Sequence, residues 1–226
     1  AFDDPDGHPH LSVVVTRDQR AGRGRLDRTW VTPPGSALAV SVLLRVEALP
    51  VANRGWIPLV AGAAMTAAVQ AQLDEREVGL KWPNDVLVGG LKICGILAEV
   101  MPGDPHSVVV GAGVNTRMTA AELPVPTATS FAALARTADE DRLLADYLTG
   151  LRDAVAALAV GGTTADAAKQ AVRTACSTIG ADVSVSLPDG VSLIGSAQGI
   201  DDEGRLIVDA AGVTHVVSAG DVVHVR

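Results

Sequence analysis

The chain has 226 residues, a formal net charge of −8 and a pI near 5.0. Apolar residues make up 48% of it, but no uninterrupted apolar run approaches the roughly 20 residues that span a bilayer. The acidic balance disfavours a surface that coats nucleic acid, because phosphate-backbone binding relies on a broad basic face. Cys94 and Cys176 lie far apart without zinc-ligand spacing, which predicts reduced thiols in a cytoplasmic protein.

The N-terminal part is predicted to be a loose lead-in followed by two strands. Residues 1–10 are rich in Asp, Pro, Gly and His and lack the basic start and apolar centre of a signal peptide. The β-branched apolar run at residues 11–16 predicts a buried strand. A Thr-Pro-Pro-Gly turn then leads into a second predicted strand at residues 37–46. The stretch between them therefore connects two core strands.

This connection is rich in arginine and glycine. Five of the fifteen arginines of the chain fall within twelve residues: Arg17, Arg20, Arg23, Arg25 and Arg28. Arginine offers planar, permanently charged donors that suit phosphate or carboxylate, and the interleaved glycines allow the backbone to approach a ligand closely. A solvated loop whose charge serves only solubility is the alternative. The position of the stretch between two strands favours a loop that binds an anion.

The middle of the chain is predicted to combine a helix with a set of short strands. Alanine-rich residues 56–73 predict a helix that packs closely on a sheet. Residues 78–92 then place Lys81 at the end of a strand, followed by a Pro-Asn-Asp turn, a short strand and a Gly-Gly hairpin. The chain has only three lysines, and two of them, Lys81 and Lys92, lie in this stretch.

Two further strands are predicted at residues 93–101 and 107–115. The second contains Gly111 and Gly113 at alternate positions, which clears one face of the sheet of side chains. A flat ligand could lie on that face. The alternative is that these glycines relieve crowding against a helix.

The C-terminal half is predicted to contain two helices and then a separate β domain. Residues 139–159 and 163–176 have helical spacing and capping signals. Beyond residue 177 the pattern changes to short alternating runs separated by glycine-containing turns, which predicts a small barrel or sandwich. We expect the domain boundary near residue 177, and no catalytic side chain from the second domain.

Several common chemistries lack their motifs. The sequence contains no phosphate-binding Gly-x-x-x-x-Gly-Lys-Ser/Thr loop, no complete dinucleotide fingerprint, no Gly-x-Ser-x-Gly elbow and no Cys/His cluster. What remains is an arginine loop, a strand-end lysine, an Asn-Asp turn and a glycine-cleared sheet face. Together they suit the activation of an acid by a nucleotide, because positive charge stabilises the negative charge that develops on phosphorus.

Four motifs in this order resemble those of biotin protein ligases. They are Gly-Arg-Gly-Arg from Gly22 on, Lys-Trp-Pro-Asn-Asp-Val from Lys81 on, Lys-x-x-Gly-Ile-Leu-x-Glu from Lys92 on and Gly-x-Gly-x-Asn from Gly111 on. The resemblance implies an α+β fold, in which a mixed β-sheet with helices on one side (residues 1–176) precedes a small SH3-like barrel (residues 177–226). It further implies that ATP and Mg²⁺ activate biotin to biotinyl-5′-adenylate. The biotinyl group then passes to one lysine of the biotin carboxyl carrier domain of an acyl-CoA carboxylase.

The resemblance also implies roles for individual residues, with Lys81 and Arg25 as the catalytic ones. Positions on the biotin side are Gln19, Gly22, Arg23, Gly24, Arg25, Lys81, Gly95, Gly111 and Gly113. Positions on the nucleotide side are Arg28, Trp30, Asn84, Lys92 and Asn115. Asp85 is the candidate Mg²⁺ ligand, with a turn residue that bonds its own backbone as the alternative. Trp30 is expected either to cover the adenine or to hold the loop on the core.

The sequence also departs from the family pattern. Members usually have a Ser-Thr-Asn triplet ahead of the first strand, and none precedes Leu11 here. No helix-turn-helix is present either, so we expect no nucleic-acid partner, and the lack of a long apolar run predicts no membrane partner. The alternatives are a lipoate-type ligase and a non-catalytic module that binds biotin or the carrier domain.

Overall fold

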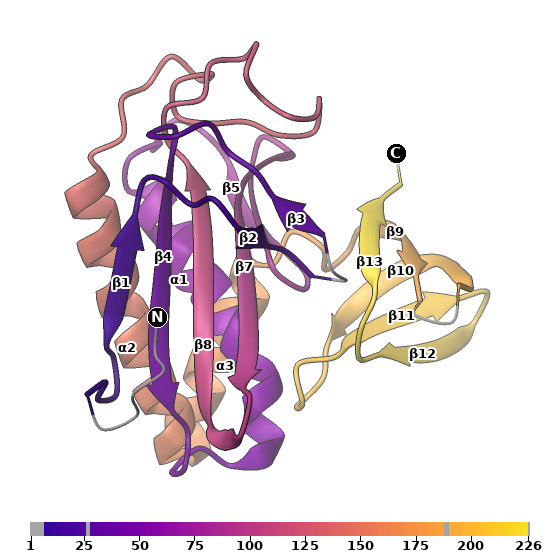
Figure 1. Cartoon of the computed structure of the whole chain (residues 1–226). Coiled ribbons are helices and arrows are strands. Elements are labelled where there is room, and N and C mark those ends of the chain that lie inside the picture. The colour runs from indigo at the N-terminus through magenta and orange to yellow at the C-terminus, as the bar shows by residue number, and fades with distance from the viewer. Residues whose placement is uncertain (1–6, 26–27, 188–189, 226) are drawn as a thin grey trace.

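The computed structural model describes residues 7–25, 28–187 and 190–225. A six-stranded sheet in the order β1-β4-β8-β7-β6-β5 forms the main body, and helices cover one of its faces (Figure 1). The strands are β1 (Val13–Thr16), β4 (Ala37–Arg45), β5 (Val78–Lys81), β6 (Asp85–Val88), β7 (Leu91–Met101) and β8 (Asp104–Asn115). The helices are η1 (Val51–Trp56), α1 (Ile57–Gln70), α2 (Glu140–Val160) and α3 (Gly162–Ala175). A two-stranded hairpin, β2 (Gly22–Arg23) with β3 (Thr29–Trp30), lies in front of the sheet.

A second, five-stranded sheet follows in the order β12-β11-β10-β9-β13. Its strands are β9 (Asp182–Ser186), β10 (Ser192–Ile200), β11 (Leu206–Ala210), β12 (Val213–Val217) and β13 (Asp221–His224). The small β unit is thus confirmed. In the part of the chain that the structure describes, β12 and β13 form the two edges of this sheet, so a closed SH3-like barrel stays a prediction.

The predicted α+β class, with helices on one side of the sheet, is confirmed. In the described residues, all strand pairs of the main sheet are antiparallel. The parallel component of the mixed sheet consists of two isolated bridges, Leu80 with Cys176 and Lys92 with Ala128.

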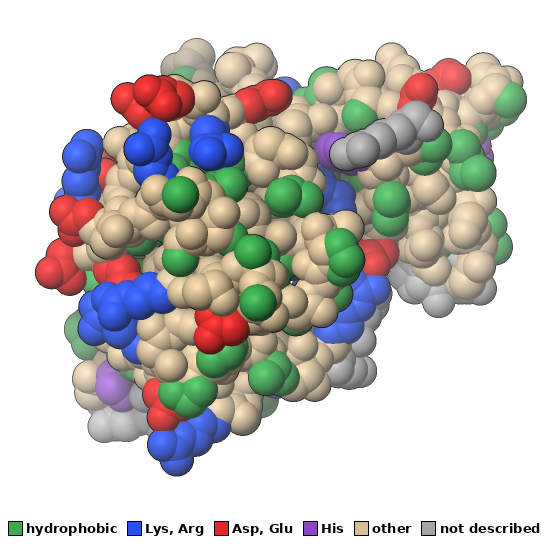
Figure 2. All heavy atoms as spheres, turned by 90° about the horizontal axis from the view of Figure 1, so that it is seen from above, with side chains coloured by type: hydrophobic (Ala, Val, Ile, Leu, Met, Phe, Trp, Pro, Cys, Tyr) green, Lys and Arg blue, Asp and Glu red, His purple; other side chains and the backbone are tan. Residues whose placement is uncertain are grey.

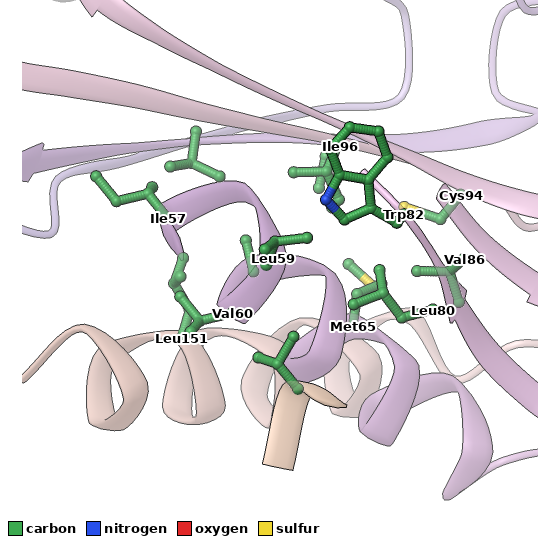
Figure 3. Close-up of a cluster of buried hydrophobic side chains, with 14 of the residues drawn as sticks. Ile57, Leu59, Val60, Met65, Leu80, Trp82, Val86, Cys94, Ile96 and Leu151 are labelled. Atoms are coloured by element: carbon green, nitrogen blue, oxygen red, sulfur yellow. The ribbon is translucent and has the colours of Figure 1, made fainter. Parts of the chain in front are cut away.

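Helix α1 packs on the sheet because its inward face alternates small and branched side chains. Leu59 and Met65 are buried on the side of the sheet that carries Leu80 and Ile96, whereas Val60 lies next to Leu151 of α2 (Figure 3). Close approach depends on Gly62, where a Cβ atom would lie 2.5 Å from Leu80 Cδ1. This layer holds the strand ends on which the functional site is built.

Strand β1 corrects one expectation. Residues 11–16 were expected to form a buried strand, but Val13, Val14 and Val15 are 38%, 39% and 42% exposed. The reason is that β1 lies at the edge of the sheet and pairs only with β4. An apolar β-branched run does not by itself distinguish an edge strand from a central one.

The second sheet is attached to the main body through the turn at residues 201–205. The indole N–H groups of Trp56 and Trp82 donate to the carbonyls of Asp202 (2.8 Å) and Gly204 (3.0 Å). Lys169 Nζ also donates to the Asp202 carbonyl, at 3.2 Å. Two buried indoles thus fix where the second sheet lies relative to the first.

None of the helices in the described ranges combines the length and apolar character needed to cross a membrane.

Candidate active site

A cavity of about 400 Å³ lies between the hairpin, the open face of the main sheet and the second sheet. Most of the predicted site residues line it: Gln19, Arg23, Gly24, Arg25, Arg28, Trp30, Asn84, Asp85, Lys92, Gly95, Gly111 and Gly113. Three others, Gly22, Lys81 and Asn115, are not among its lining residues. Segments from four parts of the chain therefore meet at one place.

The arginine loop is shaped by the β2–β3 hairpin. Gly22 pairs with Trp30, and the N–H of Gly24 donates to the carbonyl of Arg28 at 2.6 Å. A Cβ atom on Gly22 would lie 2.4 Å from the Trp30 carbonyl oxygen, so only glycine fits there. Gly22 thus serves the site through the backbone. Leu26 and Asp27, at the tip, lie outside the described residues.

The glycine-cleared sheet face is covered by Trp30. Gly95 and Gly113 are cross-strand partners on β7 and β8, and a Cβ atom on Gly113 would lie 3.0–3.1 Å from three indole atoms. The expected alternative of crowding against a helix is wrong for Gly113, since what it makes room for is the indole. The indole Nε1 atom is buried and has no hydrogen-bond partner among the described residues.

The five arginines do not form one cluster of free positive charge, because four of them each pair with a different carboxylate. Arg17 pairs with Glu140, Arg20 with Asp18, Arg23 with Glu99 (2.9 Å) and Arg28 with Asp221. Of the five, only Arg23, Arg25 and Arg28 line the cavity. The dense positive charge of the sequence is therefore largely neutralised by individual partners.

Arg25 and Lys81 differ from the other cations of the site. Neither makes an ion pair within the described part of the chain, and Arg25 Nη1 donates only to Asn84 Oδ1, at 3.2 Å. Burial lowers the pKa of both groups, and the charges of Asp85 and Asp221 act in the opposite direction. A half-buried cation without a contacting carboxylate stabilises an incoming anion strongly, because water screens it less.

Asp85 lies at the start of β6 and pairs with Lys92, with 2.6 Å between Oδ1 and Nζ. Two roles were expected for Asp85, a Mg²⁺ ligand or a turn residue that bonds its own backbone. The structure adds a third, since Asp85 is the counter-ion of Lys92. Among the residues that the structure describes, no three His, Cys, Asp or Glu side chains form a group that could hold a metal ion.

The two asparagines have different surroundings. The Nδ2 atom of Asn84 donates to the Ile96 carbonyl at 2.8 Å, which fixes its amide while Oδ1 faces Arg25. Asn115 is 2% exposed and donates to the Thr129 carbonyl at 2.9 Å. Asn115 thus braces the connection after β8 and does not line the cavity.

Two carboxylates that pair with arginines of the loop, Asp221 and Glu140, were not predicted from the sequence. Asp221 lines the cavity from β13, more than 190 residues after Arg28. Glu140, at the start of α2, accepts hydrogen bonds from Arg17, Thr116 (2.9 Å) and Arg117 (3.0 Å). No local motif marks either residue, because their partners are remote in sequence.

Comparison with known proteins agrees with this geometry. Residues 6–115 match the family model described as "Biotin/lipoate A/B protein ligase family", and residues 178–225 match "Biotin protein ligase C terminal domain". The fold and the site thus define a member of the biotin/lipoate ligase class.

Individual relatives narrow the class. The chain is 41% identical over 216 residues to the biotin–acetyl-CoA-carboxylase ligase of Mycobacterium tuberculosis, covering 95% of this chain and 79% of the relative. It is 40% identical over 108 residues to the bifunctional ligase/repressor BirA of Escherichia coli, covering 47% of this chain and 33% of that protein. The solved structure of biotin protein ligase from Aquifex aeolicus in complex with biotin and ATP matches with a TM-score of 0.80 at 22% identity, covering 96% of this chain and 90% of that one. The chain belongs to the biotin protein ligase family.

Proposed function

We propose that this protein activates biotin with ATP to biotinyl-5′-adenylate and transfers the biotinyl group to one lysine of a biotin carboxyl carrier domain. The observation that carries the proposal is the placement of two half-buried cations for which the described residues supply no contacting carboxylate: Arg25 lines the cavity, and Lys81 is the cross-strand partner of Asp85, which lines it. The name of the M. tuberculosis relative, a biotin–acetyl-CoA-carboxylase ligase, supports an acyl-CoA carboxylase as the source of the carrier domain.

In the first step, a carboxylate oxygen of biotin attacks the α-phosphorus of ATP and pyrophosphate leaves. The carboxylate is already ionised at neutral pH, so the attack requires no general base. Arg25 and Lys81 stabilise the negative charge that the attack gathers on the α-phosphate, and they shield the two anions from each other as they meet.

In the second step, the amine of the carrier lysine attacks the carbonyl carbon of the mixed anhydride and AMP leaves. An amide forms, and the attacking nitrogen loses its proton. Lys81 and Arg25 again stabilise the leaving phosphate, because the same oxygens carry the charge in both steps.

The remaining site residues divide between the substrates. We assign Gln19, Gly22, Arg23, Gly24, Gly95, Gly111 and Gly113 to the biotin side. We assign Arg28, Trp30, Asn84 and Lys92 to the nucleotide side, and we assign Asn115 to neither side. Since Asn115 does not line the cavity, its role is to brace the β8 end that carries Gly111 and Gly113.

Asp85 is the residue that would hold Mg²⁺. The described residues contain no cage of three acidic or His/Cys ligands, but Mg²⁺ that arrives on a triphosphate needs only one or two carboxylates from a protein. The donor set therefore fits once Lys92 moves from Asp85 to the phosphates. Bound there, Mg²⁺ would neutralise the charge of the leaving pyrophosphate.

We place the reaction in the cytoplasm, which the two unpaired, buried cysteines, Cys94 and Cys176, support. The proposal includes no nucleic-acid partner.

The overall reaction tests the proposal. Incubated with ATP, Mg²⁺ and biotin, the protein should attach biotin to a carrier domain, as detected by intact mass. A carrier with its acceptor lysine changed to arginine is the control and should remain unmodified. Faster transfer of lipoate than of biotin would support the lipoate-type alternative, and no transfer of either would support a binding module.

A further inference from the structure

The second sheet contributes a carboxylate to the cavity. Asp221, the first residue of β13, contacts Arg28 through Oδ2 and Nη2. Among the described residues that line the cavity, it is the one that comes from the C-terminal sheet. We expected that sheet to supply no side chain to the chemistry, so the contribution of Asp221 requires an explanation.

The main chain around Asp221 is firmly held. Asp221 is paired across strands with Ser186 of β9, and Gly220 before it packs so closely that a Cβ atom there would lie 2.8 Å from Val185 Cγ1. The sheet itself is anchored by the indoles of Trp56 and Trp82. The carboxylate of Asp221 is therefore attached to a rigid main chain.

Arg28, in contrast, is carried by the hairpin loop and its side chain is 63% exposed. A long, exposed side chain loses considerable conformational entropy when a ligand orders it. Asp221 reduces that loss by holding one nitrogen of the guanidinium. Arginine has five N–H donors, so the contact leaves others free for phosphate oxygens.

We propose that Asp221 is a positioning residue of the nucleotide site, which acts by holding Arg28 at the cavity in the orientation that receives the phosphates. The proposal rests on the function proposed above. An ordinary exposed ion pair contributes little. This pair differs because it joins a rigid sheet to a substrate loop.

The first test is the substitution Asp221→Asn, which keeps the shape of the side chain and removes its charge. In a biotin-dependent pyrophosphate-release assay, KM for ATP should rise about tenfold, while KM for biotin stays within about twofold of wild type. The thermal unfolding temperature should hardly change, because the pair is largely exposed. The control is Asp182→Asn, the same charge change at an exposed residue of β9 that does not line the cavity.

Two further variants separate positioning from a structural role. Asp221→Glu keeps the carboxylate and should restore KM for ATP to within about threefold of wild type. Combining Asp221→Asn with Arg28→Gln should raise KM no further than Arg28→Gln alone, since Asp221 acts through Arg28. An unchanged KM in Asp221→Asn, an equal rise in Asp182→Asn, or additive effects in the double variant would overturn the proposal.

Calorimetric titration of ATP alone separates this proposal from the proposed function. If wild-type protein binds ATP but never releases pyrophosphate with biotin, the proposed function fails. The Asp221 proposal is then decided by the ATP affinity: about tenfold weaker binding in Asp221→Asn upholds it, and unchanged binding overturns it.

Discussion

Lys81 and Arg25 are the residues on which the account of catalysis depends. Their partners are unlike those of the other cations, since Lys92, Arg23 and Arg28 each contact a carboxylate. A cation that is already neutralised must exchange its partner before it binds phosphate. Among the described residues, no carboxylate contacts Lys81 or Arg25, so neither requires such an exchange, which supports the proposal that they stabilise the charge that develops in the transition state.

Replacing Lys81 by alanine should therefore slow adenylate formation by about 10² or more, while biotin binding weakens less. Single-turnover formation of the adenylate at saturating biotin is the measurement. Lys81→Met, which retains the apolar stem, should be equally slow if charge is the cause. A rate within a few-fold of wild type in either variant would refute the catalytic assignment of Lys81.

The two glycines of β8 allow a matched comparison. A Cβ atom on Gly113 would lie 3.0–3.1 Å from the indole of Trp30, whereas one on Gly111 would meet only the Leu97 carbonyl oxygen, at 3.6 Å. Gly113→Ala must displace the indole and should weaken ATP binding about tenfold, and Gly111→Ala should leave it nearly unchanged. Calorimetric titration checks both. Equal affinities in the two variants would show that the position of Trp30 is unimportant.

The sequence predicted most of the cavity-lining residues, because the four motifs are local and distinctive. Asp221 could not be found in this way. It follows Gly220 in a short stretch that has the composition of a turn, and its partner, Arg28, is 193 positions away in the sequence. Ion pairs that depend on how two domains meet leave no local pattern.

At the level of elements, Glu140 links the strand before the arginine loop to the strand that carries the glycines. It accepts hydrogen bonds from Arg17 after β1 and from Thr116 and Arg117 after β8. Burial alone would raise the pKa of Glu140, but the hydrogen bonds from Arg17 and Thr116 and the charge of Arg117 hold it below its ordinary value. The ionised form of Glu140 therefore stabilises this junction.

The lowered pKa of Glu140 determines how its contribution to the stability of the fold changes with pH. Since the folded-state pKa of Glu140 is depressed, its contribution to stability is present above the ordinary value of about 4.3 and is lost as pH falls through the lower folded-state pKa. Glu140→Gln should lower the unfolding temperature by about 2–4 °C at pH 7, and by progressively less below about pH 4. The other carboxylates titrate in wild type and in Glu140→Gln alike, so the difference in unfolding temperature between the two proteins reports on Glu140. If the difference in unfolding temperature between wild type and Glu140→Gln stayed constant in acid, the stabilising role of ionised Glu140 would be contradicted.

The helices and the longer strands were predictable from hydrophobic periodicity, and the hairpin was not. Strands β2 and β3 have two residues each and no apolar alternation, because they are held by the Gly22–Trp30 pairing and by the sheet beneath Trp30. Strand β13 is likewise only four residues long, and it is defined by its pairing with β9. Elements that depend on tertiary contacts carry little signal of their own.

In the whole molecule, the second sheet is held against the main body by side chains of the main body that donate to backbone carbonyls of the turn at residues 201–205. Basic and acidic side chains lie next to one another on the face shown in Figure 2, and no large region of one sign is visible there. Attachment depends instead on the turn at residues 201–205, where Gly55 lies against the main chain of Glu203. This close approach leaves no room for a side chain at position 55.

Gly55→Ala tests it, because a Cβ atom there would lie 2.2 Å from the Glu203 carbonyl oxygen. The variant should lose about 1–3 kcal/mol of unfolding free energy. It should also form adenylate more slowly, since Asp221 moves with the sheet. Gly199→Ala is the control, because a Cβ atom at that strand position has no neighbour within 4 Å. Denaturant unfolding and the adenylate assay should separate the two variants; equal behaviour would mean that the docking contact is dispensable.

The reaction proposed for this chain begins with the formation of an acyl-adenylate from biotin and ATP. The most direct measurement is the release of pyrophosphate from Mg-ATP without any carrier domain, on addition of biotin or of lipoate. We predict that biotin releases one pyrophosphate per protein molecule in a rapid burst, about as fast as the adenylate appears, and that lipoate releases none above background. A burst with lipoate and not with biotin, or no burst with either acid, would contradict this proposal.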